Sequence, residues 1–178
     1  CRRILYNILT MRKYIGIDIG KKGAIYMMNE DGNEEWRVAM PMIKDQVDWH
    51  ELNAILEPYQ MFNGMVVYEK LGVIFGTSKK TAFSMGEQYG AVRQCCISNN
   101  IRYTEVPAKK WQAEMFEGQV NIQKTGKTSR DTKAMALVAA KRLFPTVNLL
   151  MTKASSVPHD GLVDALLMAE YARRKFPR

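Results

Sequence analysis

One short segment constrains the fold more than any other part of the sequence. From residue 14 to residue 19 every second residue is isoleucine, and Gly16 and Asp18 stand between the isoleucines. This alternation predicts a β-strand with one apolar face, because successive side chains of a strand point to opposite sides. A carboxylate such as Asp18 is costly to bury without a partner. We therefore expect an interior strand that carries a functional acid near its end.

The rest of the chain alternates between strands and helices. Apolar runs and turn residues predict strands at 24–28, 35–40, 65–69 and 101–106, and helices at 48–59, 81–98, from 107, 128–144 and 158–174. We expect Phe83 to face the core, and Thr128 or Ser129 to cap the fourth helix.

A meander of three strands followed by crossover helices predicts the fold class. We expect an α/β fold with a five-stranded mixed sheet, three antiparallel strands and then two parallel strands, flanked by helices. A length of 178 residues favours one domain, at 13–178, preceded by a disordered extension at 1–12.

Charge gives the first indication of function. The chain holds 26 Lys and Arg against 18 Asp and Glu, a net charge of +8 at neutral pH. A domain this basic is typical of proteins that bind polyanions, most often nucleic acid, although charge also serves solubility. Basic residues accumulate between 121 and 153, where Asp131 is the only acid. This segment is the expected nucleic-acid surface.

Cysteine content and hydropathy narrow the setting. The three cysteines are Cys1 and the adjacent pair Cys95 and Cys96, which cannot form a disulfide framework. No apolar run approaches the roughly 20 residues that cross a bilayer. We therefore expect a reducing compartment, the cytoplasm or, as the alternative, an organelle, and no membrane partner.

Four acids are expected to converge at one edge of the sheet. Asp18 and Glu69 end two strands that a right-handed crossover makes parallel, so their carboxyl ends share an edge. Asp160 and Asp164 are four residues apart on the last helix and share a face. Clustered carboxylates repel unless cations neutralise them, and oxygen ligands favour Mg²⁺ or Mn²⁺. The pattern predicts two-metal phosphodiester cleavage, with a helix cap at Asp160 and a solvated Asp164 as the alternatives.

Four motifs, in order, carry a resemblance to a known family. They are Tyr-Ile-Gly-Ile-Asp-Ile-Gly (14–20), Val-Val-Tyr-Glu (66–69), Ser-Met-Gly-Glu-Gln-Tyr-Gly (84–90) and His-Asp-Gly-Leu-Val-Asp-Ala-Leu-Leu-Met-Ala-Glu-Tyr (159–171). Together they resemble the RuvC family of Holliday junction resolvases, in a variant similar to those of phages. The resemblance implies an RNase H-like fold and a homodimer that uses no small-molecule cofactor. It also implies Mg²⁺-dependent symmetric nicking of four-way DNA junctions in recombination, repair or phage genome processing. The expected setting is then the cytoplasm of a bacterium or of a phage-infected cell.

The resemblance also assigns residues. It implies that Asp18, Glu69 and Asp164 hold two metal ions, with Mn²⁺ able to replace Mg²⁺. Asp160 takes the place of the remaining acid, although it precedes Asp164 by four residues where bacterial members often have three. His159 adjoins these acids, either to transfer a proton, to contact the scissile phosphate, or only to start the helix.

Further residues are expected to contact DNA or a second subunit. Phe75 matches the family's apolar probe of the junction centre, with Ile74 as the alternative and core packing as the other interpretation. The expected phosphate contacts are Lys79, Lys80, Lys124, Lys127, Arg130 and Lys133. The expected dimer interface is the helix at 81–98, through Met85, Tyr89 and Val92.

Other functions compete with this interpretation. Gly-Ile-Asp-Ile-Gly (16–20) also resembles the first phosphate loop of sugar kinases and actin-like ATPases, but those proteins need two such domains, which 178 residues cannot supply. A non-catalytic nucleic-acid-binding domain gives no reason for a full set of four acids. Another RNase H-like or transposase-type nuclease activity stays an alternative.

Overall fold

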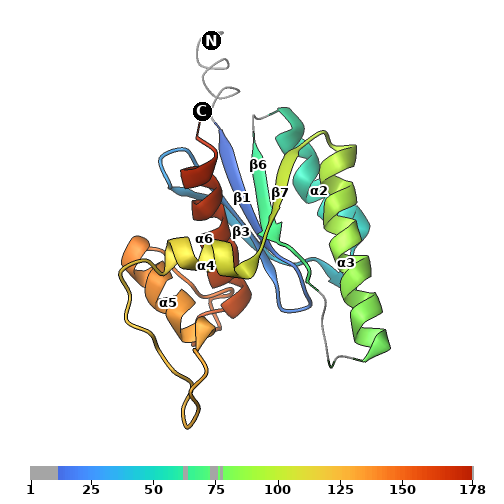
Figure 1. Cartoon of the computed structure of the whole chain (residues 1–178). Helices are drawn as coiled ribbons and strands as arrows, with labels where there is room; N and C mark the ends of the chain where they lie inside the picture. Colours follow the sequence, from blue (N-terminus) through green and yellow to red (C-terminus); the bar gives the residue numbers. More distant parts are fainter. Residues whose placement is uncertain (1–11, 62–63, 73–75, 77, 178) are drawn as a thin grey trace.

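A mixed β-sheet forms the centre of the molecule. The computed structural model describes residues 12–61, 64–72, 76 and 78–177, and Figure 1 shows their arrangement. The sheet contains β1 (Lys13–Asp18), β2 (Ala24–Asn29), β3 (Glu34–Ala39), β6 (Met65–Glu69) and β7 (Arg102–Val106), in the order β3-β2-β1-β6-β7. β1, β2 and β3 pair antiparallel, whereas β6 pairs parallel with β1 and β7. The expected five-stranded mixed sheet is confirmed.

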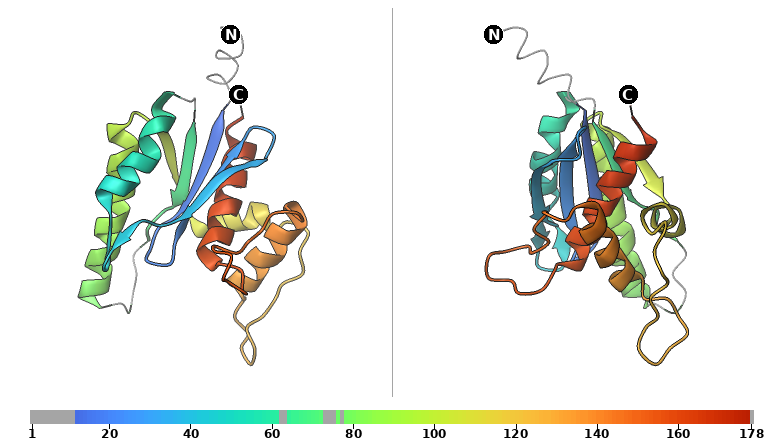
Figure 2. Two further views of the ribbon diagram at one scale, coloured as in Figure 1. Left: turned by 180° about the vertical axis from the view of Figure 1, so that it is seen from behind. Right: turned by 90° about the vertical axis from the view of Figure 1, so that its left-hand side faces the viewer.

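Helices cover both faces of this sheet (Figures 1 and 2). One face carries α2 (Trp49–Leu56), the 3-10 helix η1 (Glu57–Met61) and α3 (Lys79–Ser98). The other face carries α4 (Ala108–Met115), α5 (Thr132–Leu143) and α6 (Asp160–Lys175). A short hairpin of β4 (Met42–Ile43) and β5 (Gln46–Val47) precedes α2.

The alternation of β1 explains the two apolar layers. Ile15 and Ile17 belong to the core between the sheet and α2 and α3. Tyr14, on the opposite face of the strand, belongs to the core that the sheet forms with α4, α5 and α6. The period of two residues thus supplies an apolar residue to each side of one strand.

The closest approach between layers is that of α6 and β1. A Cβ atom at Gly16 would lie 1.9 Å from the carbonyl oxygen of Ala165 and 2.5 Å from the amide nitrogen of Ala169. The backbone of α6 therefore rests directly on the strand. α4 and α5 pack against the same helix, which is buried along most of its length. Even so, no helix in the described part of the chain is long and apolar enough to cross a membrane.

The start of α5 differs from the sequence-based expectation. Asp131, and neither Thr128 nor Ser129, caps the helix, and its Oδ1 accepts a hydrogen bond from the amide of Ala134 at 3.0 Å. A β-bridge between Gln123 and Arg130 holds the preceding residues in a loop, so the helix begins later than expected.

α3 also differs from expectation in the direction of its side chains. Phe83 does not face the core, because its side chain is 70% exposed. The first buried residue of α3 is Gln88, so the first turns of the helix extend past the sheet (Figure 1). The prediction that Val92 contributes to a dimer interface is wrong, since this residue is fully buried in the core.

The two ends of the described chain meet. Arg12, which was expected in a disordered extension, is buried. Its guanidinium donates hydrogen bonds to the backbone carbonyls of Phe176 and Pro177, both at 2.6 Å. The rest of the expected extension, residues 1–11, lies outside the described residues.

The contact at Gly16 gives a prediction about stability. We expect Gly16→Ala to lower the free energy of unfolding by about 3 kcal/mol, because the added methyl group meets helix backbone that cannot turn aside. Thermal unfolding should show a melting temperature roughly 6–12 °C lower. Gly72→Ala is the matched control, since no described atom lies within 4 Å of a Cβ there. Equal melting temperatures of the two variants would contradict the proposed contact.

Candidate active site

Three carboxylates from separate elements line one cavity at the edge of the sheet. The cavity measures about 700 Å³, and Asp18, Glu69 and Asp164 contribute to its wall. Ile17 and Tyr68 are partners in the parallel register of β1 and β6, so Asp18 and Glu69 follow at the same edge. Asp164 comes from α6, whose close approach to β1 carries it to this edge.

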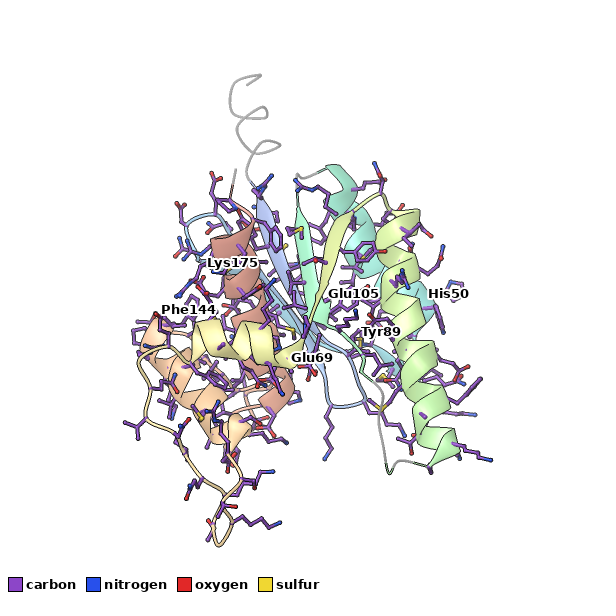
Figure 3. The ribbon with its side chains drawn as sticks, in the orientation of Figure 1. His50, Glu69, Tyr89, Glu105, Phe144 and Lys175 are labelled. Atoms are coloured by element: carbon purple, nitrogen blue, oxygen red, sulfur yellow. The ribbon has the colours of Figure 1, made fainter. Side chains whose placement is uncertain are left out.

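The opposite wall of the cavity comes from α3. Ser84, Met85, Gln88 and Tyr89 line it there, and Figure 3 shows Glu69 and Tyr89 on the two facing elements. Met85 and Tyr89 were expected at a dimer interface, but the structure turns them toward this cavity. Gln88 is buried and donates a hydrogen bond from Nε2 to Ser84 Oγ at 3.1 Å.

Burial and mutual repulsion raise the affinity of two of these acids for protons. Removal from water is the main cause that raises the pKa of Asp18 to about 7, and the charges of Asp164 and Glu69 add to it. Burial likewise raises the pKa of Asp164 to about 7, with the charges of Glu69 and Asp160 as further causes. Lys133 partly opposes both shifts. Near neutral pH, a cation in the cavity would therefore relieve a real repulsion.

Glu69 is held by a residue that the sequence did not indicate. The indole Nε1 of Trp111 donates a hydrogen bond to Glu69 Oε2 at 3.2 Å. Trp111 is almost fully buried on α4 and stands edge-on to Phe116, with 6.1 Å between ring centroids. A lone tryptophan in a short helix carries no sequence signal for this role, because only the folded chain brings α4 beside the end of β6.

Asp160 does not line the cavity of the other three acids. Its carboxylate is 61% exposed and accepts a hydrogen bond from Lys133 Nζ at 2.6 Å. Both residues line a second pocket of about 230 Å³, to which Asp164 also contributes. The hydrogen bond to Asp160 raises the pKa of Lys133. Asp160 is therefore paired with a cation of the protein itself, one helical turn from Asp164.

His159 begins α6. Its Nδ1 accepts a hydrogen bond from the amide of Leu162 at 3.1 Å, and its own amide donates to the carbonyl of Leu149 at 2.9 Å. The sequence left three roles open for His159, and the structure shows one of them, the N-cap of the helix. This N-cap orients the first turn, in which Asp160 lies.

The residues expected to contact DNA lie on both sides of the cavity. Lys124, Lys127 and Arg130 are exposed in the loop before α5. Lys79 and Lys80 are exposed at the start of α3, and Lys80 also lines the cavity. Figure 1 shows this loop and the start of α3 flanking the same edge of the sheet. Phe75 and its alternative Ile74 lie outside the described residues.

The donor set of the cavity fits a hard divalent cation. Carboxylate oxygens from three elements are the ligands that Mg²⁺ and Mn²⁺ prefer, and burial, with the charges of the neighbouring acids as a further cause, raises the pKa of Asp18 and of Asp164. Within the described ranges, no three His, Cys, Asp or Glu side chains already stand together as a finished ligand group. Binding of an ion therefore requires these side chains to draw closer.

The shifted carboxyls give a prediction about pH and metal. Because folding raises the pKa of Asp18 from 3.8 to about 7, the stabilisation by its proton is complete below about pH 4 and is lost as the pH rises through 7. In EDTA, we expect Asp18→Asn to melt well above the wild type at pH 8, by about half as much at pH 5.5, and close to it at about pH 4. As the pH rises from 4 to 7, the difference in the free energy of unfolding between the variant and the wild type should grow by about 1 kcal/mol per pH unit. This corresponds to roughly 2–4 °C in melting temperature per pH unit.

Added Mg²⁺ should raise the melting temperature of the wild type more at pH 8 than at pH 5.5, because protons compete for the carboxylates. Asp31→Asn, in the exposed turn after β2, is the control and should leave the pH profile unchanged. A difference between Asp18→Asn and wild type that does not depend on pH would contradict the burial of this acid.

The fold is similar to that of solved structures, among them two of Thermus thermophilus RuvC. Thermus thermophilus RuvC in complex with a Holliday junction substrate matches with a TM-score of 0.55 at 15% sequence identity, over 92% of this chain and 96% of that one. A second structure of Thermus thermophilus RuvC matches with a TM-score of 0.53 at 15% identity, over 91% and 96%. No protein-family model and no curated protein sequence matches the chain. At this identity the likeness establishes the architecture: the chain has the RNase H-like fold of RuvC.

Proposed function

We propose that this protein is a divalent-metal-dependent nuclease that resolves four-way DNA junctions. The observation that carries the proposal is the cavity that Asp18, Glu69 and Asp164 share on a RuvC-like sheet. A net charge of +8 supports a polyanionic substrate, since an acidic cavity alone would repel one. A metal ion reconciles the two features, because it turns the acidic cavity into a site for phosphate.

The four acids and Trp111 each have a part in the proposed reaction. Asp18, Glu69 and Asp164 would hold two divalent ions, Mg²⁺ or Mn²⁺, and Asp160 would complete the set. Bound ions of this kind activate a water molecule and stabilise negative charge on the phosphate. Trp111 keeps the Glu69 carboxylate in one orientation.

The basic segments supply the proposed DNA surface. Lys124, Lys127 and Arg130 on one side of the sheet edge, and Lys79 and Lys80 on the other, would bind backbone phosphates. Lys133 lies nearest the acids and would exchange Asp160 for a phosphate. Phe75 would probe the centre of the junction from the segment that follows Glu69.

The proposal predicts which variant loses cleavage. Asp18→Asn should lower the rate of cleavage of a four-way junction by at least about 10³-fold, because it weakens ion binding at the centre of the site. Junction binding should stay the same or become tighter, since the change removes negative charge. The rate is measured on a labelled junction in Mg²⁺, with Asp31→Asn as the control.

Two further substrates make the experiment specific. A junction should be cut at symmetric positions into products that ligase seals without processing, whereas a flap and an RNA–DNA hybrid should be cut poorly. Preferred cleavage of the hybrid would replace the junction-resolving proposal with another RNase H-like nuclease. Full cleavage of the junction by Asp18→Asn would overturn the assignment of the site.

We also propose that the protein acts as a C2 homodimer, because a four-way junction presents two equivalent scissile strands. The exposed face of α3 supports this. Phe83 is 70% exposed and Ile97 is 53% exposed, and Gly86 and Gly90 lie between them on the same face. No described atom lies within 4 Å of a Cβ at either glycine, so a second helix could approach closely there.

This surface gives a prediction about assembly. We expect the wild type to sediment as a dimer at micromolar concentration and Gly90→Gln to sediment as a monomer, because a long side chain holds the two helices apart. Ala54→Gln adds the same amide side chain to the exposed face of α2 and should remain dimeric. A monomeric wild type, with and without junction, would exclude this interface.

A further inference from the structure

The mouth of the cavity carries an ion pair that has no part in the proposed catalytic site. Lys21, in the turn between β1 and β2, donates a hydrogen bond from Nζ to Asp45 Oδ1 at 2.7 Å. Asp45 lies at the tip of the β4–β5 hairpin, between the register partners Ile43 and Gln46. Both side chains line the cavity together with the three acids.

Asp45 occupies a position that suits an anion. Its partner Lys21 comes from one side of the mouth, and Lys80, at the start of α3, comes from another and also lowers the pKa of Asp45. A carboxylate that faces lysines from two separate elements occupies the kind of place where a backbone phosphate would bind. Lys21 is thus paired in the free protein with a negative charge of the chain itself, and Lys80 lies near the same charge.

The two partners differ in how firmly they are anchored. The turn that carries Lys21 is tight, because Gly23 donates its amide hydrogen to the carbonyl of Gly20 at 2.9 Å. α6 presses against this turn, since a Cβ at Gly161 would lie 2.3 Å from the carbonyl oxygen of Lys22. Asp45, by contrast, is at the tip of a hairpin with two residues in each strand.

The pair itself is weak. The side chain of Lys21 is 54% exposed and that of Asp45 is 80% exposed, so water screens their attraction. A nucleic-acid strand brings a row of phosphates, and each lysine that binds one releases counterions. Exchange of Asp45 for a phosphate is therefore favourable for a strand that already occupies the cavity.

We propose that Asp45 holds the place of a backbone phosphate of the bound strand, next to the one at the acids, and gives up Lys21 when that strand binds. The inference rests on the proposed function, because it takes a DNA strand as the ligand of the cavity. Asp45 lowers the affinity only for a strand that reaches Lys21, because such a strand must first break the ion pair. A ligand that does not reach Lys21 leaves the pair intact.

The experiment measures binding of a labelled four-way junction in EDTA over a series of salt concentrations. Asp45→Asn should bind about two- to fivefold tighter than wild type, with an unchanged slope of log affinity against log salt. Lys21→Ala should bind more weakly and flatten that slope by about one unit, the contribution of one phosphate. The double variant should match Lys21→Ala, because Asp45 acts through Lys21.

Each outcome decides the matter. Equal tightening by Asp45→Asn with and without Lys21 would overturn the inference, since Asp45 would then act only as a general negative charge. A wild-type slope in Lys21→Ala would overturn it as well. Glu57→Gln is the control. Glu57 is exposed at the start of η1, which precedes β6, whereas the cavity lies at the opposite end of that strand, so this variant should change affinity less than Asp45→Asn. A wild type that binds no junction at low salt would overturn the proposed function itself, and the inference with it.

Discussion

The contact between the backbone of α6 and Gly16 of β1 is the constraint on which the site depends. An ordinary side chain at Gly16 would push the helix away from the sheet, because Ala165 and Ala169 leave no room for one. The same helix meets the turn after β1 at Gly161. With both glycines in place, Asp164 reaches the cavity of Asp18 and Glu69 without a long side chain to bridge the layers. A short carboxylate on a fixed backbone has little freedom, which suits a ligand that must hold its place.

The charged residues around the cavity form a central group of acids with a Lys–Asp pair on each side. Asp18 and Asp164 are partly buried, Glu69 is exposed, and the charges of the three acids repel one another. On each side of them stands an exposed Lys–Asp pair, Lys21 with Asp45 and Lys133 with Asp160. Exposed pairs of this kind contribute little to stability. Their position suggests a role in binding instead. Each aspartate keeps a lysine oriented at the edge of the site, and a phosphate can replace the aspartate.

Much of this arrangement could be predicted from the sequence, and the exceptions have physical causes. The alternation of residues 14 to 19 and the crossover rule predicted the parallel pairing that brings Asp18 and Glu69 to one edge. Periodicity could not show that α3 extends past the sheet, which exposes Phe83. Nor could spacing reveal Trp111 beside Glu69 or Asp45 beside Lys21, because these partners are distant along the chain and meet only after folding. The pairing of Asp160 with Lys133 is of the same kind.

The hydrogen bond between Arg12 and Phe176 has a consequence for attaching the domain to other molecules. β1 starts beside the contact between Arg12 and Phe176 and ends at Asp18. Its six residues therefore place this contact and the cavity about 20 Å apart, at opposite edges of the sheet. Figure 1 shows the start of β1 and the end of α6 together on the side away from the loop before α5. A tag attached to the domain beside Arg12 or Phe176 would start at the edge of the sheet away from the cavity. That edge is therefore suited to surface attachment, with the acidic cavity facing outward.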